Sequence, residues 1–558
     1  MLTFFTIFFI MVFLIPIILI ICILYWTADF RRPDLKISKS RYDLTRDSDG
    51  FKECPGGWLF RNRYGFWEAY VSGTPEDRGG AMGSMCRNLL AYQEEAFIGF
   101  IKAYVKSFSY LRILYWLTIV FIRRMADNVP EEYRKEIYAA SEFSSHTYDI
   151  FCDSYVRQLS YHAAHDIGHF MQDYMLVGCT SFAVWGDRSK DGRLLLARNF
   201  DFCVGDDFSR NRIILFSEPD TGYRYASITW PGMIGVVSGM NEKGLTITLN
   251  ASKGRIPLQA TAPVSILARH ILQYSSNIAE AMEIARNFKT IVPEIFTIGS
   301  RADGKAAVIE KAGKVTSLYE RDDDMLICTN HFQSDAFKED KHNIKNIQRS
   351  DSPYRYDRVN ELILEKGKIG IDEAVAVLRD RKGKGGVEMG MGNPKAINQL
   401  IAHHSVIFSP EELKMWVSTS PWQCGEFICY DLNEVFGSPE PTGESRVKHE
   451  FNIPAEQDFT DDMYKDMIRY RELSRQISDA ISAKEVVEEA VLDDFAALNP
   501  DYYETYEIIG DYRLSRDDKK TAVENWKAAL GFEVPTLDIS ENIRKKIKKN
   551  DKKSRNRI

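Results

Sequence analysis

The stretch GCTSFAVWGDRSKDGRLLLARNFDF, residues 178–202, decides the fold. It consists of two β-type runs separated by a polar segment that ends in an Asp-Gly pair, which is typical of a hairpin turn. Two strands joined by a tight turn run back beside one another. The hairpin therefore brings Arg198 and Asp201, near the end of the second strand, beside Cys179 at the start of the first.

A cysteine directly after a glycine at this place can carry unusual chemistry. A free thiol has a pKa of about 8.5 and reacts as the thiolate, which the Arg198 guanidinium would favour by charge attraction. If Cys179 became the first residue of a chain, its α-amine, with a pKa of about 7.7–8.0, would serve as the base and Asp201 would orient it. Gly178 lacks a Cβ, so the thiol can approach its carbonyl for an N-to-S acyl shift. Residue by residue, a structural cysteine and a structural Arg–Asp pair remain the alternatives.

The composition favours a globular protein and gives no sign of a nucleic-acid-binding or disulfide-rich one. The chain has 558 residues, 27% of them charged, and a net charge of −7, which is ordinary for a globular protein of about two to four structural units. This charge balance gives no reason to expect a nucleic-acid partner. The sequence has no Gly-rich phosphate loop and no zinc-spaced cysteine pair, so we predict no cofactor. The nine cysteines are scattered and odd in number, which does not indicate a disulfide framework.

The order of elements indicates the fold class. From the hairpin to about residue 251, short β-type segments alternate with turns, and helices are expected at 263–287 and 371–380. Further strands follow, the last of them ending near residue 435. Strands, then helices, then strands again are typical of a layered α/β sandwich. Upstream, residues 88–175 have mostly helical periodicity.

Several motifs resemble those of the N-terminal cysteine hydrolases, a superfamily that includes penicillin acyltransferases, conjugated bile acid hydrolases, acid ceramidase and N-acylethanolamine amidase. The stretch 178–202 resembles the maturation site of this superfamily. The bile acid hydrolases lack a prosegment, whereas GTPEDRGGAMG (73–83), upstream of Cys179, resembles the opening motif of the penicillin acyltransferase branch. The other motifs follow the 178–202 stretch in order: GMNEKGLTITLNAS (239–252), ICTNHFQ (327–333), SPYRYDR (352–358) and SVIFSPEELKMWVS (405–418).

The resemblance implies a role for each matching residue. Cleavage of the Gly178–Cys179 bond would free Cys179, which would attack an amide carbonyl and form a thioester. Asn250 and Asn330 would stabilise the oxyanion, a contribution of about 3–4 kcal/mol per donor. Arg198 and Asp201 would tune and orient the nucleophile. Arg355 would support the charge network, with Arg358 as the competing alignment.

The resemblance also implies the architecture. We expect an α/β fold, namely a four-layer αββα sandwich of the N-terminal-nucleophile hydrolase type.

The C-terminal region has a spacing of its own. Small and large packing positions at Gly510, Ala522, Trp526 and Ala529 match those of a tetratricopeptide unit, although a plain docked helical hairpin is the alternative. The predicted units are a transmembrane anchor (1–28), a linker (29–64), a helical prosegment that becomes a separate α chain (65–178), the catalytic domain (179–440), a helical appendix with one tetratricopeptide-like hairpin (455–540) and a basic disordered tail (541–558).

An apolar segment opens the chain. Residues 2–26, LTFFTIFFIMVFLIPIILIICILYW, carry no charge and as a helix would exceed the roughly 30 Å hydrocarbon core of a bilayer. No basic residue precedes them and no small-x-small site follows, which favours an uncleaved single-pass anchor over a signal peptide. Basic residues between 31 and 41 favour a cytoplasmic body, but the side stays open. Residues 110–122 are too short to span and contain Arg112, so a buried or membrane-apposed helix is expected there.

Three histidines form a candidate metal cluster. His162, His165 and His169 share one helix face with Asp166 beside them, a spacing that could bind a metal. Their place in the prosegment favours packing on the catalytic domain or shaping of the substrate mouth, so we predict no metal. A glycosylation-type sequon begins at Asn250, a proposed oxyanion residue, and is predicted to be unmodified.

Three functions are compatible with these observations. The first is a self-activating amidase or acyltransferase acting on a small-molecule amide or acyl substrate, with its own cleaved prosegment as a tightly associated chain. The second is a dipeptidase-type member of the same superfamily. The third is a catalytically silent, membrane-anchored scaffold that binds partners through its helical appendix.

Overall fold

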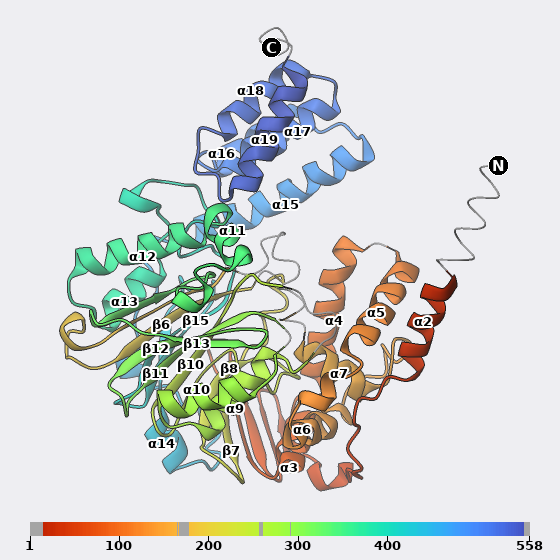
Figure 1. Ribbon diagram of the computed structural model, residues 1–558, viewed down its shortest axis with the longest axis vertical. Coiled ribbons are helices and arrows are strands. Elements are labelled where there is room, and N and C mark those ends of the chain that lie inside the picture. Colours follow the sequence, from red (N-terminus) through yellow and green to blue (C-terminus); the bar gives the residue numbers. More distant parts are fainter. Residues whose placement is uncertain are drawn as a thin grey trace.

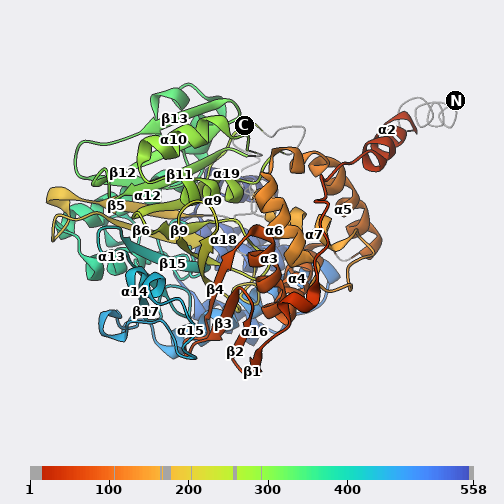
Figure 2. The same ribbon diagram turned by 90° about the horizontal axis from the view of Figure 1, so that it is seen from below.

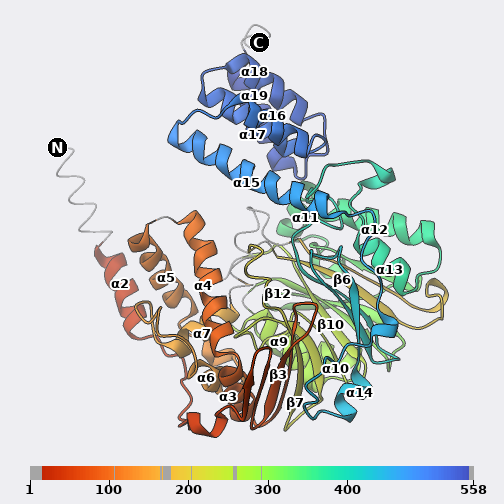
Figure 3. The same ribbon diagram turned by 180° about the vertical axis from the view of Figure 1, so that it is seen from behind.

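The computed structural model describes residues 15–105, 107–163, 166, 178–202, 204–255, 261–290 and 292–551. The fold is mixed α/β, as predicted, and two sheets form its centre (Figure 1). The helices gather in three places: on the outer faces of the sheets, in an N-terminal group beside them, and in a C-terminal group on top of them (Figures 1 and 3).

The larger sheet contains eleven strands within the described residues. Neighbouring strands are antiparallel except β4 and β7, which run parallel. In spatial order the strands are β1 (Arg46–Ser48), β2 (Phe51–Cys54), β3 (Gly57–Arg61), β4 (Trp67–Gly73), β7 (Ile213–Pro219), β8 (Tyr225–Thr229), β9 (Ser238–Asn241), β10 (Leu245–Ala251), β11 (Glu294–Ser300), β12 (Lys305–Ala312) and β13 (Val315–Tyr319).

The smaller sheet carries the predicted hairpin. Its second and third strands, β5 and β6, are antiparallel, and Ser181 lies opposite Arg198. This pairing confirms the hairpin predicted from the 178–202 stretch. The order is β14 (Met325–Cys328), β5 (Thr180–Val184), β6 (Leu195–Asp201), β15 (Ala402–Ser409), β16 (Lys414–Ser418) and β17 (Phe427–Asp431).

The elements form layers in the order helix, sheet, sheet, helix. Leu196, Phe216 and Val406 are fully buried in the core between the two sheets. A second core lies between the larger sheet and helices α9 (Val264–Tyr274) and α10 (Ile278–Asn287). A third lies between the smaller sheet and helices α12 (Ser352–Lys366) and α13 (Ile371–Leu378). Two further helices, α11 (Lys341–Arg349) and α14 (Leu432–Gly437), belong to this part.

The N-terminal region corrects one prediction. Residues 29–64, expected as a linker, contain β1–β3, because a Pro55-Gly56 turn, with Gly56 at a φ of 89°, folds β3 back on β2. Trp58 and Leu59 of β3 are buried, which fixes this hairpin on the body. The helices that follow β4 are α3 (Pro75–Met85), α4 (Arg87–Tyr104), α5 (Phe108–Ile122), α6 (Glu131–Ser141) and α7 (Ser154–His162).

The glycines of the GTPEDRGGAMG motif allow helix α3 to lie close against α6. A Cβ on Gly79 would fall 2.2 Å from the Glu136 carbonyl oxygen, so no larger residue fits there. The buried Glu136 carboxylate also binds Arg78 of α3 at 2.9 Å and Arg269 of α9 at 2.7 Å. Burial would raise the pKa of Glu136, but these two guanidinium groups hold it below its usual value. The ion pairs join α3 and α6 to α9, which packs on the larger sheet. Figure 2 shows these three helices near one another.

The C-terminal appendix is helical, as expected. Its helices α17 and α18 form the predicted hairpin, in which Trp526 packs on Gly510. The predicted disordered tail, residues 541–558, is wrong for 541–550, which belong to helix α19. Ile543 of α19 is fully buried among the other appendix helices, and this apolar contact orders a segment whose composition is basic. The helices are α15 (Asp461–Ala483), α16 (Glu489–Leu498), α17 (Tyr503–Ser515), α18 (Lys519–Ala529) and α19 (Leu537–Asn550).

The apolar N-terminus is described only in part. Helix α2 (Ile15–Trp26) covers the second half of the predicted anchor, and residues 2–14 lie outside the described residues. Among the described residues no single helix is long and apolar enough to cross a membrane. The ranges Arg87–Ala103 and Phe108–Asn128 pass that test only as a pair, bent by 112°.

Candidate active site

Cys179 lies at the start of β5 and is fully buried. Its Sγ is 3.4 Å from Nη2 of Arg198, on the neighbouring strand β6. Burial raises the pKa of this thiol above its usual value, and the positive charge of Arg198 opposes the rise without cancelling it. In the intact chain the sulfur is therefore a protonated thiol that already has a guanidinium beside it.

Arg198 is held in place by backbone and hydroxyl acceptors. Its Nη1 donates to the Val237 carbonyl over 2.6 Å and to Ser238 Oγ over 2.5 Å, and its Nη2 donates to the Leu249 carbonyl. The guanidinium also lies 4.4 Å above the ring of Phe200. These contacts fix the position of the positive charge relative to the sulfur.

The peptide bond between Gly178 and Cys179 is held on both sides. The Gly178 N–H donates to the Asp201 carbonyl over 3.1 Å, and the Gly178 carbonyl accepts from Nε2 of Gln399 over 3.0 Å. The Cys179 carbonyl accepts from Nη1 of Arg355 over 2.7 Å. Sequence reasoning identified Asp201 and Arg355 but missed Gln399, which lies in a segment without periodicity or motif.

Asp201 is buried with no hydrogen-bond partner for either carboxyl oxygen among the described residues. Burial raises its pKa to about 8, although Arg355 and Arg198 pull it in the opposite direction. Its backbone carbonyl accepts from the Gly178 N–H, so Asp201 lies beside the Gly178–Cys179 bond. A buried carboxyl group without a donor is costly, and an amine at Cys179 would supply that donor.

The two predicted oxyanion residues lie beside the same site. Asn250 accepts from Ser181 Oγ over 2.7 Å and donates to the carbonyls of Cys328 and Thr329 over 3.2 and 3.1 Å. Asn330 donates to the Ala251 carbonyl over 2.8 Å. Both side-chain amides are thus engaged with backbone oxygens and link the two sheets. Asn250 is fully buried, which agrees with the prediction that its sequon is unmodified.

The structure separates the two competing arginines. Arg355 donates to Cys179 and to Thr180 Oγ1, and its Nη2 donates to Asn330 Oδ1 over 2.8 Å. Arg358 instead pairs with Asp380 and Glu361 at 2.9 and 3.0 Å. Helix α12 carries both residues, but only Arg355 contacts Cys179. The six predicted site residues are therefore gathered around one peptide bond: Cys179, Arg198, Asp201, Asn250, Asn330 and Arg355.

The candidate histidine cluster is described only at His162 and Asp166, since His165 and His169 lie outside the described residues. The Nδ1 of His162 donates to the Gln158 carbonyl over 2.8 Å, and its Nε2 accepts from the Ile234 N–H over 3.0 Å. Burial lowers its pKa to about 4, so the ring is neutral and both nitrogens are occupied. Among the described residues no group of three His, Cys, Asp or Glu side chains is arranged to hold a metal ion.

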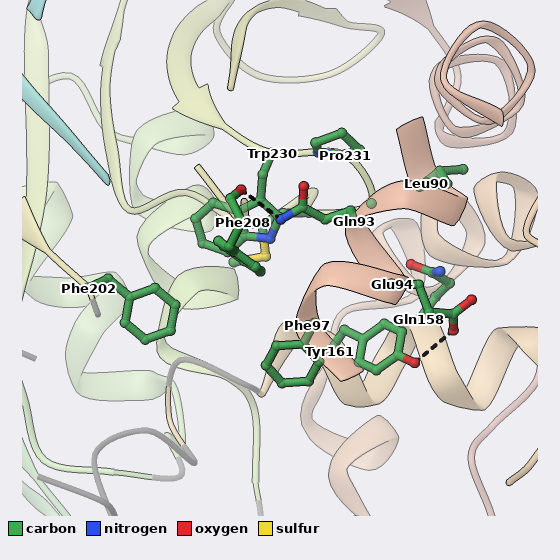
Figure 4. A pocket seen from close by; sticks show the side chains of 12 residues that line it. Leu90, Gln93, Glu94, Phe97, Gln158, Tyr161, Phe202, Phe208, Trp230 and Pro231 are labelled. Carbon is green, nitrogen blue, oxygen red and sulfur yellow. Dashed lines mark hydrogen bonds between the residues drawn. The ribbon is translucent and has the colours of Figure 1, made fainter. Parts of the chain in front are cut away.

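A pocket opens between the N-terminal helices and the catalytic domain (Figure 4). Its cavity volume is about 30 Å³, and aromatic rings line both sides. Phe97 and Tyr161 come from α4 and α7, and Phe202 and Trp230 come from the catalytic domain. Glu94, which also lines it, accepts from Tyr161 Oη over 2.7 Å and pairs with Arg157 at 2.9 Å. The pocket is therefore mainly apolar, and Phe202 directly follows Asp201 of the site.

Comparison with known proteins agrees with the motifs. Residues 188–419 match the family model of acyl-coenzyme A:6-aminopenicillanic acid acyl-transferase. A protein of Archaeoglobus fulgidus, described as uncharacterized, is 25% identical over 283 residues, which cover 44% of this chain and 46% of that protein. The chain thus spans about half the length of the curated relative that it matches.

The solved structures similar to this chain have low sequence identity to it and low TM-scores. The N-acylethanolamine-hydrolyzing acid amidase ortholog of Caenorhabditis elegans is 16% identical, with a TM-score of 0.31, over 42% of this chain and 93% of its own. A mutant conjugated bile acid hydrolase of Clostridium perfringens is 17% identical, with a TM-score of 0.33, over 48% of this chain and 95% of its own. The match of residues 188–419 to the model of the acyl-coenzyme A:6-aminopenicillanic acid acyl-transferase family confirms the resemblance predicted from the sequence.

Proposed function

We propose that this chain is a self-activating N-terminal cysteine amidohydrolase or acyltransferase. The observation that carries the proposal is the environment of one peptide bond. Gly178 and Cys179 are held by hydrogen bonds on both sides of that bond, Arg198 lies beside the thiol, and the buried Asp201 carboxyl lacks a donor among the described residues. A structural cysteine needs none of these arrangements.

Activation breaks the bond in two steps. The Cys179 sulfur attacks the Gly178 carbonyl carbon, the thiol proton passes to the leaving nitrogen, and the carbon–nitrogen bond breaks to give a thioester and a free amine. Water then hydrolyses the thioester, which leaves a carboxylate on Gly178 and restores the thiol. The new α-amine lies beside Asp201, whose carboxyl group can hold and orient it.

The mature site then acts on an amide substrate. The α-amine accepts the thiol proton as the sulfur attacks the substrate carbonyl, and it returns a proton to the departing amine. Asn250 and Asn330 provide amide donors for the oxyanion once substrate displaces the carbonyl oxygens that they bind now. Water or an acceptor amine resolves the thioester, giving hydrolysis or acyl transfer.

The pocket favours an apolar acyl group over a dipeptide. A substrate with a free amino terminus needs an available carboxylate, but the one carboxylate among the described lining residues, Glu94, is already paired with Arg157 and Tyr161. The rings of Phe97, Phe202 and Trp230 offer apolar surface instead. The pocket lining therefore favours an N-acyl amide substrate over the dipeptide of a dipeptidase reaction.

We further propose that residues 2–26 anchor the protein in a membrane and that helix α5 lies against the same surface. Ile18, Leu19 and Ile23 of α2 are exposed, as are Ile113 and Leu117 of α5. The two helices contact one another, and α5 lies between α2 and α4, which lines the pocket (Figure 3). Alkaline carbonate extraction of membranes from expressing cells tests this proposal: the full chain should stay in the pellet, and recovery in the supernatant would contradict it.

Intact mass and N-terminal sequencing of the full-length protein test the activation. We expect two fragments in the wild type, the second beginning at Cys179, and one uncut chain in Cys179→Ala. Cys328→Ala is the matched control, because this buried cysteine adjoins the site but not the bond, and it should be cut normally. A wild type that stays in one piece and still turns over an acyl amide would show that the activation scheme is wrong. A wild type that stays uncut and inactive would favour the silent scaffold.

A further inference from the structure

Residues 389–400 form a segment of the catalytic domain that reaches from the helical appendix to the Gly178–Cys179 bond. It runs between helix α13 and strand β15 and contains neither helix nor strand. Its inner end carries Gln399, whose side chain is buried and whose Nε2 donates to the Gly178 carbonyl over 3.0 Å. A Cβ on Gly178 would fall 2.8 Å from that same Nε2, so this contact explains why a glycine precedes the nucleophile.

The outer side of this segment is held by the helical appendix. Asn499 uses both ends of its amide on one residue: its Oδ1 accepts from the Met391 N–H and its Nδ2 donates to the Met391 carbonyl, each over 2.9 Å. Asn393 donates to the Glu533 carbonyl over 2.8 Å. Arg471 donates to the carbonyl of Leu400, the residue after Gln399, over 2.6 Å.

These contacts fix the segment from outside the catalytic domain. Asn499 and Asn393 are buried, so their hydrogen bonds do not compete with water. Figures 1 and 3 show the appendix seated above the sheets near α11 and α12, where it can reach this segment. The position of Gln399 therefore depends on residues of the appendix, such as Asn499 and Glu533, that follow it far along the chain.

We propose that Gln399 is the oxyanion donor of self-cleavage and that the appendix positions it; this inference rests on the proposed activation of the Gly178–Cys179 bond. When the Cys179 sulfur attacks the Gly178 carbonyl, the π electrons of that bond move onto its oxygen. The Nε2–H of Gln399 already donates to this oxygen and stabilises the negative charge that develops there. The oxyanion then collapses, the carbon–nitrogen bond breaks, and the nitrogen keeps the proton that left the thiol.

Gln399 is thus a catalytic residue of the cleavage, whereas Asn499, Asn393 and Arg471 act through it. An appendix fixed against residues 389–400 holds the amide of Gln399 at the carbonyl before the reaction begins. A displacement of about 1 Å in such a group can cost about 100-fold in rate. The appendix therefore couples the folding of the C-terminal helices to activation of the nucleophile.

The rate of self-cleavage tests the role of Gln399. The full-length protein is made by a short pulse of cell-free synthesis, and intact mass follows the uncut fraction with time. Gln399→Met keeps the size of the side chain but removes the donor, so we expect cleavage to slow by about 100- to 1,000-fold. Gln423→Met is the matched control, because Gln423 is also buried but contacts the Leu378 carbonyl, and it should be cut at nearly the wild-type rate.

A pH profile separates the donor role from a structural one. In Gln399→Glu, the protonated carboxyl group can donate to the Gly178 carbonyl, whereas the carboxylate cannot. The cleavage rate of this variant, relative to that of Gln423→Glu, should therefore recover as the pH is lowered. A ratio that does not change with pH would mean that residue 399 only fills space, which would overturn the inference.

The appendix is tested with Asn499→Leu, which should slow cleavage by about 10- to 100-fold because residues 389–400 lose both hydrogen bonds to that side chain. Asn525→Leu is its control, since Asn525 donates to the Thr521 carbonyl of its own helix, α18. If the wild type is cut, Cys179→Ala is not, and Gln399→Met and Asn499→Leu are cut at the wild-type rate, this inference is wrong and the proposed function stands. If the wild type itself remains uncut, both are wrong.

Discussion

Arg355 donates to the carbonyl oxygen of Cys179 over 2.7 Å, so a residue of helix α12 holds the backbone of a residue at the start of β5. The same guanidinium reaches Thr180 Oγ1 at 2.8 Å and Asn330 Oδ1 at 2.8 Å. It therefore joins the proposed nucleophile, Cys179, to a predicted oxyanion residue, Asn330. Because Arg355 is buried, its hydrogen bonds are strong and its loss is not compensated by water.

Arg355→Met should reduce turnover of an N-acyl amide by about 100-fold or more, because the Cys179 backbone and Asn330 lose their shared donor. Arg358→Met is the matched control from the same helix. It should leave kcat nearly unchanged but lower the free energy of unfolding by about 3 kcal/mol, since Asp380 loses its partner. Steady-state kinetics and thermal unfolding measure the two effects. Equal loss of turnover in both variants would contradict the assignment.

Asp201 should make the uncut precursor less stable as the pH rises. Burial raises its pKa to about 8 from a usual value of 3.8, so between these values the folded state binds more protons than the unfolded state. Stability is then greatest at low pH and falls by up to about 1.4 kcal/mol per pH unit as the pH rises toward 8. The thermal unfolding midpoint of Cys179→Ala, measured from pH 5 to 8, should show this decline.

Adding Asp201→Asn to Cys179→Ala should make that decline smaller, because an asparagine does not ionise, whereas Glu504, whose pKa burial raises to about 7, still contributes to it. Asp187→Asn, at an exposed position, is the control and should leave the decline in place. A decline of the same size in the Asp201→Asn protein would assign it to another group.

Phe97→Ala should raise the KM for an amide with an apolar acyl group by about 10-fold, because one aromatic wall of the pocket is lost. The kcat should change little, since Phe97 touches none of the reacting groups. Tyr92→Ala removes a ring from the same helix outside the pocket lining and serves as the control. The KM values of the two variants are measured with substrates of increasing acyl length. Identical KM values in both variants would show that this pocket does not bind the acyl group.

Gly510→Ala should destabilise the appendix by about 1–3 kcal/mol. A Cβ there would fall 2.5 Å from the Trp526 ring, whereas one on Gly99 of helix α4 meets nothing within 4 Å. Gly99→Ala should therefore stabilise its helix by about 0.5–1 kcal/mol. Limited proteolysis of the appendix measures the first effect and thermal unfolding the second. Equal protease resistance of Gly510→Ala and wild type would contradict the close packing of α17 on α18.

Local patterns predicted only part of the site, because Asn250, Asn330 and Arg355 were identified from the resemblance to the N-terminal cysteine hydrolases. Arg198 and Asp201 were found because alternation and an Asp-Gly turn determine which residues of a hairpin face one another. The resemblance favoured Arg355 and left Arg358 as the competing alignment; both residues lie on α12, and in the structure only Arg355 contacts Cys179.

Other features had weaker signals or none. Gln399 lies in a segment whose conformation comes from distant helices, so no local pattern could reveal it. Helix α19 was missed because its basic composition concealed Ile539, Ile543 and Ile547, which recur every four residues and pack on the appendix. That signal was present in the sequence. The hairpin of β2 and β3 was missed because short strands around Pro-Gly resemble a loop.

Strand β4 gives a cut at Gly178 a particular outcome. It lies between β3 and β7, and its seven residues from Trp67 to Gly73 pair with Ile213 to Pro219. Cleavage of the backbone would divide the polypeptide but leave this shared sheet intact. The upstream fragment could dissociate only if the hydrogen bonds between β4 and β7 broke. The two pieces would behave as one molecule until denatured, and any tether at the N-terminus would continue to hold the catalytic half after that half had become a separate chain.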